Sequence, residues 1–223
     1  MRITRRGLLG WSLAALAVPS LAPPPLSPRQ AAAEADDGTR LAAAARAQIG
    51  VTLIYDPAYV RLAFPGGDLD RRRGVCADVI IRAYRDAFAL DLQALVHRDM
   101  TAAFARYPSR RTWGLARPDR NIDHRRVLNL EVFLERRGAR LWRNDGAARD
   151  GTAFAASFAP GDLLTWRLDG RLPHIAILGE AGDAPTVIHN IGLGTQEEPL
   201  ALLAPHLPVA HYRWTAVTAH RAG

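Results

Sequence analysis

The chain has no lysine, so all 29 of its basic side chains are arginines, and against 22 acidic side chains they give a net charge of +7. We attribute the missing lysine to a GC-rich coding bias. A basic chain suggests nucleic acid as a partner, but no nucleic-acid-binding motif is present. Residues 1–35 hold four arginines and one glutamate, which leaves +4 on the rest of the chain. A charge of this size equally suits an anionic cell wall or membrane surface, and we expect no nucleic-acid partner.

Cysteine is almost as scarce, since Cys76 is the only one in the chain. A single cysteine excludes an internal disulfide bond. In an oxidising compartment, a lone thiol is either buried and inert or retained for its reactivity. Cys76 is therefore the residue on which a functional interpretation depends.

Long hydrophobic runs are also missing, because the apolar stretch at residues 7–22 is too short to span a bilayer comfortably. A pair of arginines within residues 4–10 precedes it, and this pattern resembles a twin-arginine export signal. We therefore expect residues 1–35 to be a signal and linker, the protein to be periplasmic or otherwise exported, and no membrane span beyond this leader. Because prolines follow Ala22 directly and disfavour cleavage there, an uncleaved N-terminal anchor is the alternative.

The remaining length suits one domain, which we place at residues 39–216. Residues 23–38 are rich in proline, alanine and aspartate and are interpreted as a linker. Apolar periodicity predicts helices at residues 41–49, 76–89, 92–106 and 123–137. Strands are predicted at residues 51–55, 162–167, 173–178, 186–190 and 209–214. Helices followed by a run of strands indicate an α+β fold, with the helices packed on an antiparallel sheet of about four to six strands.

Cys76 lies at the predicted start of a helix. Backbone N–H groups at a helix N-terminus stabilise an anion, so this position predicts a lowered pKa for the thiol. The N–H of Cys76 itself has no acceptor within the first turn, which makes it a candidate donor to an oxyanion. Taken alone, a cysteine at this position is better explained as a small buried hydrophobic residue.

A thiol nucleophile usually needs a base, and His174 is the candidate because it opens the apolar strand at residues 175–178. A hairpin centred on Gly182 would pair His174 with Asn190, and a slip of one residue would place His189 opposite it instead. Either side chain could hold the imidazole in one tautomer by a hydrogen bond. On these grounds both are candidates for the orienting residue.

Four motifs follow one another along the chain: Gly-Val-Cys-Ala-Asp-Val-Ile at residues 74–80, Pro-Gly-Asp-Leu-Leu-Thr-Trp at 160–166, Pro-His-Ile-Ala-Ile-Leu at 173–178 and Val-Ile-His-Asn at 187–190. Their order resembles the NlpC-type superfamily of papain-like cysteine peptidases and amidases. More closely, residues 41–214 resemble an uncharacterised exported bacterial branch of that superfamily. The resemblance implies a papain-like fold and the catalytic set Cys76, His174 and His189, which is why we prefer His189 to Asn190.

The sequence departs from the wider superfamily at the nucleophile. Most members have Asp-Cys-Ser there, whereas this chain has Val75-Cys76-Ala77 with the acid at Asp78. The role of the preceding acid therefore does not transfer to this chain. Asp78 falls in the first helical turn, where a carboxylate interacts favourably with the helix dipole.

A polar run supplies the candidates for substrate binding, which are Asn121, Asp123, His124, Arg125 and Arg126. An arginine in this run could hold a carboxylate bidentately, and the amide or imidazole groups could bind a substrate amide. A solvated helix start explains the run equally well. Tyr55 is a second oxyanion candidate, as an upstream tyrosine is in some relatives, against the simpler interpretation as an ordinary core or surface residue.

These features predict an exported cysteine hydrolase that cleaves an amide or peptide bond. The superfamily and the export signal together suggest peptidoglycan peptide as the substrate. A catalytically silent binding module of the same fold and a thiol acyltransferase are the alternatives. A metal hydrolase is a weaker rival, because the residues of metal-ligand type show no HExxH or other tight metal spacing. The residues of metal-ligand type are His97, Asp99, Asp123, His124, His174 and His189. We expect a monomer that uses no metal and no cofactor.

Overall fold

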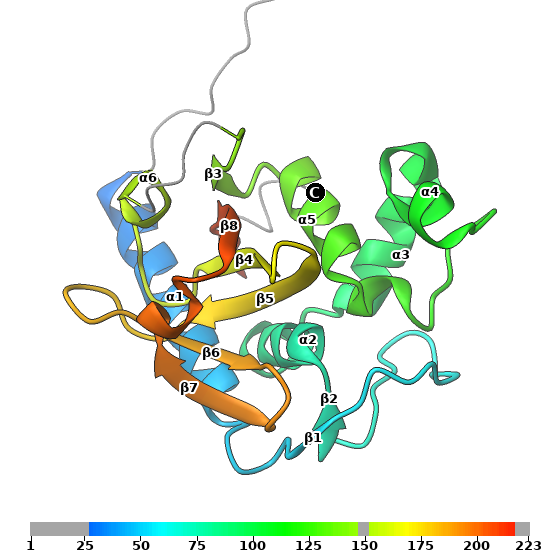
Figure 1. Ribbon diagram of the computed structural model, residues 1–223, viewed down its shortest axis with the longest axis horizontal. Coiled ribbons are helices and arrows are strands. Elements are labelled where there is room, and N and C mark those ends of the chain that lie inside the picture. Colours follow the sequence, from blue (N-terminus) through cyan, green and yellow to red (C-terminus); the bar gives the residue numbers. More distant parts are fainter. Residues whose placement is uncertain (1–26, 147–151, 217–223) are drawn as a thin grey trace, which may run out of the picture.

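The computed structural model describes residues 27–146 and 152–216, and the predictions for the export signal in residues 1–26 lie outside these ranges. The described chain has the predicted α+β architecture, in which most helices come first and a six-stranded antiparallel sheet follows (Figure 1). In these residues we find no helix with the length and apolar character required to cross a membrane.

The sheet has the strand order β3-β8-β4-β5-β6-β7, and every neighbouring pair is antiparallel. The strands are β3 (Arg140–Arg143), β4 (Leu163–Leu168), β5 (Leu172–Leu178), β6 (Thr186–Asn190), β7 (Thr195–Pro199) and β8 (Leu207–Tyr212). The helices are α1 (Pro28–Arg46), α2 (Cys76–Phe88), α3 (Leu92–Ala103), α4 (Ser109–Trp113), α5 (Val127–Arg136) and α6 (Thr152–Ala155). Short 3-10 helices occur at η1 (Phe104–Arg106), η2 (Asp123–Arg125) and η3 (Leu200–Leu203). A separate parallel pair joins β1 (Ile54–Tyr55) to β2 (Arg73–Gly74).

Helix α2 forms where predicted because its apolar residues recur at helical spacing. The buried stripe includes Val79, Ile80, Ala83 and Tyr84. At the start of the helix, the Asp78 carboxylate accepts a hydrogen bond from the Val75 N–H at 2.7 Å, which satisfies a donor that the first turn leaves free. Each fully buried branched side chain in the stripe contributes roughly 1.5–3 kcal/mol. The stripe therefore holds α2 against the sheet with Cys76 at its N-terminus.

Strand β5 separates two cores, because successive side chains of a strand point to opposite faces. Ile175 and Ile177 join the large core formed with α1, α2 and α5. Ala176 and Leu178 join a smaller core that α6 and η3 cover on the other face. His174 pairs in register with Trp166 of β4, near the beginning of β5. The N-terminus of α2 and the beginning of β5 meet at this end of the sheet.

The Pro-Gly-Asp turn before β4 has a structural role. Asp162 is only 1% exposed, and its carboxylate lies 2.7 Å from Nε2 of His211 and 2.7 Å from Nε of Arg213. These two contacts join the beginning of β4 to the end of β8, which stabilises the centre of the sheet.

Helix α1 contradicts the linker predicted for residues 23–38, because it begins at Pro28. Ser27 and Gln30 form a reciprocal capping box, and a proline in the first turn is already constrained to a helical φ. The alanine-rich sequence that follows favours the helix, so the proline and aspartate content was a misleading signal of a linker.

Other elements differ from the prediction, either in their bounds or because they were not predicted. The helix predicted from Asp123 begins at Val127, because Asp123 lies in η2 and its carboxylate accepts the N–H of Asp119 at 2.6 Å instead of capping the helix. Strands β3 and β7 were not predicted, since neither has a clear alternation of apolar and polar residues. Of the strand predicted at residues 51–55, only Ile54–Tyr55 forms.

Candidate active site

Cys76 is the first residue of α2 and is 4% exposed. Burial raises the pKa of its thiol to about 11, and the nearby charge of Asp78 acts in the same direction. Backbone N–H groups of Ile175, Ala77 and Cys76 itself act against this rise. The predicted lowering of the thiol pKa is therefore wrong, because desolvation outweighs the backbone donors. Cys76 is a neutral thiol in the resting protein.

Ile175, whose N–H opposes the rise in the Cys76 pKa, immediately follows His174 in the sequence. The sulfur of Cys76 thus lies against the beginning of β5. Pro173, the residue before His174, lines the same cavity as Cys76. The beginning of β5 therefore lies beside the N-terminus of α2.

His174 and His189 are hydrogen-bonded to each other. Nε2 of His174 lies 2.8 Å from Nδ1 of His189, and the two rings meet edge to face with their centroids 5.0 Å apart. His174 is 2% exposed and His189 is 1% exposed. Because few rotamers fit so confined a space, this contact fixes the orientation of both rings.

The strand register that brings them together differs from both predicted pairings. Leu178 pairs with Val187 rather than with Thr186, and Ile177 pairs with Ile188. The strands have therefore slipped by one residue in the direction opposite to the one that we considered. Continued along β5, this register still places His189 on the same face as His174, since the side-chain period of a strand is two residues.

Asn190, the alternative orienting residue, has different partners. Its amide Nδ2 donates to the carbonyl of Gly74 at 3.0 Å, and its Oδ1 accepts from the N–H of Gly192. Asn190 is fully buried. It joins the end of β6 to the loop before Cys76, and among the described residues it makes no hydrogen bond to His174.

Glu198 on β7 extends the contact between the two histidines. Its Oε2 lies 2.7 Å from Nε2 of His189. Sequence analysis missed this residue, because β7 was not predicted and Glu198 falls in a polar segment without periodicity. Its proximity to His189 follows from the pairing of β6 with β7, in which Glu198 is opposite Val187.

Burial keeps both imidazoles neutral. The pKa of His174 is lowered to about 3, mainly by burial, and positive charge at His189 and His206 acts in the same direction. Burial also lowers the pKa of His189, although the hydrogen bond to Glu198 partly opposes this. The thiol and both imidazoles are therefore neutral. Cys76 packs on the face of β5 that bears Ile175, whereas His174 shares the face of Trp166 and Ala176, and no hydrogen bond joins Cys76 to His174 among the described residues.

An open cavity of about 460 Å³ adjoins Cys76. Its walls come from the loop after β1, the beginning of α2, the end of α4, the beginning of α5 and the beginning of β5. Tyr55 lines it as well, and burial raises the pKa of its hydroxyl to about 12, with the charges of Cys76 and Asp78 acting in the same direction. Tyr55 is therefore a protonated donor on the cavity wall that contains Cys76, as its candidate oxyanion role requires.

Arg125 is committed to the protein itself. Its guanidinium forms two hydrogen bonds of 2.9 Å to the Asp78 carboxylate and two more to the carbonyls of Asp56 and Ala58. Although Arg125 borders the cavity, these four hydrogen bonds occupy most of its donors and its side chain is 2% exposed. The geometry gives Arg125 a structural role and does not support its predicted substrate contact.

Arg126 is the member of the predicted binding run that best fits substrate recognition. Its guanidinium stacks 4.0 Å from the ring centroid of Trp113 and lies 3.1 Å from Asp123, and it lines the Cys76 cavity. Its side chain is 19% exposed, so a bound group can reach it. Arginine held flat against an aromatic ring is well suited to bind a carboxylate.

The other three members of the run are occupied or buried. Asn121 bonds to Tyr59 and to the N–H of Leu62. Asp123 is 1% exposed, and burial raises its pKa. His124 is 2% exposed, its Nδ1 has no hydrogen-bond partner among the described residues, and burial lowers its pKa to about 3.

A family model described as "Domain of unknown function (DUF1287)" matches residues 42–214. The chain belongs to this family. A relative from Escherichia coli (strain K12), "Uncharacterized protein YijF", is 46% identical over 198 residues, which are 87% of this chain and 90% of the relative. No solved structure matches the chain. Neither description names an activity, so a function for this DUF1287 domain rests on the geometry of its site.

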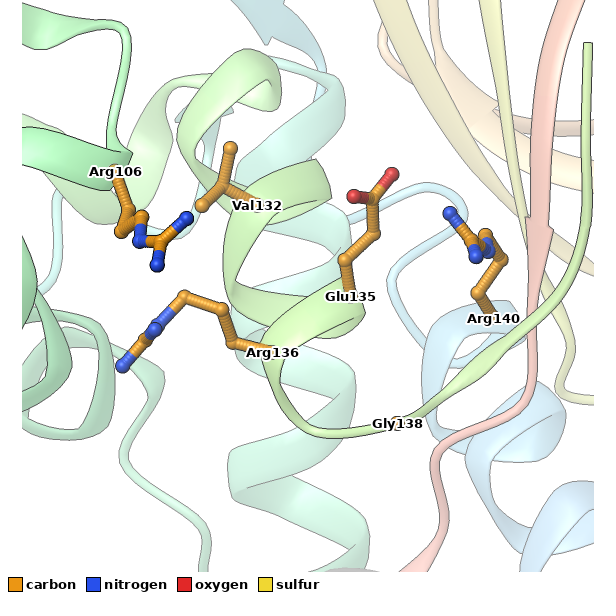
Figure 2. A pocket seen from close by; sticks show the side chains of 6 residues that line it. All are labelled: Arg106, Val132, Glu135, Arg136, Gly138 and Arg140. Carbon is orange, nitrogen blue, oxygen red and sulfur yellow. The ribbon is translucent and has the colours of Figure 1, made fainter. Parts of the chain in front are cut away.

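The DUF1287 domain has a second cavity of about 510 Å³ between η1, α5 and β3 (Figure 2). Figure 2 shows Arg106 and Arg136 on one side of α5, and Glu135 and Arg140 on the side toward β3. Asp99 pairs with Arg136 at 2.6 Å, and Glu135 pairs with Arg143. None of the residues that line the Cys76 cavity borders this one, so it is a separate arginine-rich surface.

Residues of metal-ligand type do not cluster in the described part of the domain. Within residues 27–146 and 152–216, no group of three His, Cys, Asp or Glu side chains is placed to hold a metal ion. His174 instead bonds to His189, which in turn bonds to Glu198.

Proposed function

We propose that this DUF1287 domain is a cysteine hydrolase of the papain-like, NlpC type, which cleaves an amide or peptide bond. One observation carries the proposal: the only thiol of the chain lies at the N-terminus of α2, in the wall of an open cavity, against the beginning of the strand that bears His174. The proposed nucleophile, base and orienting residue lie on α2, β5 and β6, which are neighbouring elements of the domain.

In the proposed reaction, proton transfer accompanies the attack. His174 takes the thiol proton while the sulfur of Cys76 bonds to the carbonyl carbon, and the carbonyl π electrons move to oxygen. The resting site contains a neutral thiol and a neutral imidazole, so no ion pair precedes the substrate. The carbon–nitrogen bond then breaks, and the leaving amine takes the proton from His174. Water, deprotonated by His174, releases the acyl group and restores the thiol.

The oxyanion has two candidate donors. The Cys76 N–H lies in the first turn of α2, where backbone donors lack helical acceptors. The Tyr55 hydroxyl lines the cavity and stays protonated because of its raised pKa. Each donor directed at the developing charge lowers the barrier by roughly 2.7–4 kcal/mol in comparable sites.

The cavity favours a peptide substrate with a carboxylate. Tyr55, Tyr59 and Trp113 offer flat apolar surface, and Arg126 supplies a positive charge at the same wall. Peptidoglycan stem peptides have this chemistry, and the predicted export signal directs the protein to their compartment. Cell-wall peptide is therefore the substrate class that we propose. We expect the enzyme to act as a monomer without a cofactor.

The proposal is tested by trapping the acyl-enzyme. Purified protein is incubated with muropeptides and with a panel of activated amide and ester substrates, and the intact mass is measured. Because Cys76 is the only cysteine, a thioester adduct that is absent from Cys76→Ala assigns the nucleophile without ambiguity. Arg140→Ala, in the separate arginine-rich cavity, is the matched control and should retain the adduct.

The outcomes distinguish the alternatives. Release of free acid supports the hydrolase, whereas transfer of the acyl group to an added amine supports the thiol acyltransferase. Cleavage of other amides with unchanged muropeptides would remove the cell-wall assignment alone. Binding of muropeptides without any adduct on Cys76 would overturn the catalytic proposal in favour of the silent binding module.

A further inference from the structure

We propose that Glu198 is a positioning residue, which fixes the tautomers of both histidines and so leaves Nδ1 of His174 as the base. The inference rests on the proposed function of Cys76 and His174 and adds a fourth residue to that site. It depends on a continuous set of contacts from Glu198 through His189 to His174, with heavy-atom distances of 2.7 Å and 2.8 Å.

The first step concerns His189. An ionised carboxylate has only acceptors, so the atom that faces it must donate. Oε2 of Glu198 faces Nε2 of His189, which therefore bears the hydrogen. A neutral imidazole has one N–H and one lone pair. Because burial keeps His189 neutral, its Nδ1 has the lone pair and accepts.

The second step concerns His174. Its Nε2 faces the accepting Nδ1 of His189 and must donate, so Nε2 bears the hydrogen and Nδ1 has the lone pair. This is the protonation state in which Nδ1 can take a proton from a thiol. Without Glu198, the hydrogen between the rings could equally belong to His189. His174 would then have its hydrogen on Nδ1 and would lose its base.

The surroundings contain no equivalent substitute among the described residues. Glu197, the neighbour of Glu198 on β7, pairs with Arg46 at 2.6 Å and accepts from Thr186. His206 is the other histidine that acts on His174, and its Nδ1 already accepts the N–H of Asp169 at 3.3 Å. Trp166 packs at 6.4 Å between ring centroids and contributes no charge.

The partial exposure of Glu198 also suits a residue that orients the His189 ring. Its side chain is 28% exposed, whereas His189 is almost completely enclosed. The carboxylate thus remains solvated while it accepts the hydrogen bond, which limits the cost of placing a charge beside a buried ring. A carboxylate that orients an imidazole in this way acts through another residue and does not touch substrate.

The test is nitrogen-15 NMR of the imidazole rings, because ring nitrogens with and without hydrogen have well-separated shifts. In wild type, Nδ1 of His174 should lack hydrogen. In Glu198→Leu, which removes the acceptor, a mixture of tautomers should appear. Glu198→Gln retains an amide oxygen as acceptor and should restore the wild-type pattern. Glu197→Gln is the matched control on the same strand and should leave both rings unchanged.

Activity gives a second readout. With any substrate that acylates Cys76, Glu198→Leu should lower kcat at least about tenfold with little change in KM, and Glu198→Gln should recover most of it. A wild-type tautomer pattern in a folded Glu198→Leu variant would overturn the proposal. The NMR result does not require turnover, so a tautomer change in a protein without hydrolase activity would leave this inference intact while the proposed function fails.

Discussion

The carboxylate of Asp78 and the guanidinium of Arg125 form a bidentate pair inside the protein, with two hydrogen bonds of 2.9 Å and side chains that are 4% and 2% exposed. Asp78 also caps the first turn of α2, and Arg125 also holds the carbonyls of Asp56 and Ala58. One ion pair thus connects the first turn of α2 to the loop after Tyr55. Asp78, two residues after Cys76, therefore has a structural role.

We predict that removing one partner of this pair destabilises the domain strongly. Arg125→Met leaves the Asp78 carboxylate buried without its counter-charge, and breaking a buried pair in this way costs roughly 3–5 kcal/mol. Urea unfolding followed by circular dichroism measures the change. Arg71→Met, which removes an exposed ion pair with Asp86, should cost about 1 kcal/mol or less. Equal losses in the two variants would contradict the structural role of Arg125.

We predict that alkylation of Cys76 accelerates only at alkaline pH. Burial raises the thiol pKa to about 11, so the thiolate fraction at neutral pH should be far below that of a free cysteine, whose pKa is about 8.5. Iodoacetamide rates measured from pH 6 to pH 11 on the folded protein give the profile, and the urea-unfolded chain is the control. A folded-state profile with a midpoint below that of the unfolded chain would contradict the neutral resting site.

We predict that stability falls as the pH drops below about 6.5, the ordinary pKa of histidine. His124 and His174 have pKa values lowered to about 3 by burial, so the unfolded chain binds their protons before the folded one does. Their stabilisation is fully present above pH 6.5 and is lost progressively toward pH 3. Each group costs about 1.4 kcal/mol per pH unit in this window. In His124→Gln, the pH dependence of the urea midpoint should be shallower by one such contribution, and an unchanged slope would contradict the assignment.

We predict that Arg126 selects substrates with a carboxylate. Arg126→Gln should lower kcat/KM for such a peptide roughly 10- to 100-fold, because a hydrogen bond to a charged group is worth about 1.5–3 kcal/mol. The same peptide with its carboxylate amidated is the control, and the variant should process it as wild type does. A loss of equal size for both peptides would indicate that Arg126 shapes the cavity through Trp113 rather than by binding charge.

The sequence allowed a useful part of the fold and site to be predicted. The stripe of α2 and the apolar runs of β5 and β6 predict their elements because burial on one face leaves a periodic pattern. The first part of helix α1, residues 28–38, and strand β7 lack such a pattern: the first depends on its cap, and the second on pairing with β6. Long-range pairing of this kind has no local signal.

The site shows the same limit. Cys76 and His174 could be proposed from their places in predicted elements, whereas Glu198 depends on a strand that was not predicted. The register between β5 and β6 was predicted wrongly, yet His189 was preferred because of the family resemblance. The thiol pKa was predicted in the wrong direction, because a helix start is visible in a sequence and the depth of burial is not.

The hydrogen bond from Asn190 to the carbonyl of Gly74 has a consequence for how the site responds to a bound substrate. Asn190 follows His189 directly, and Gly74 lies two residues before Cys76. The end of β6 and the loop before α2 are thereby tied together. A molecule that pushes on the loop before α2 would displace β6 with it, so the spacing between Cys76 and His189 would be preserved while the cavity wall adjusts.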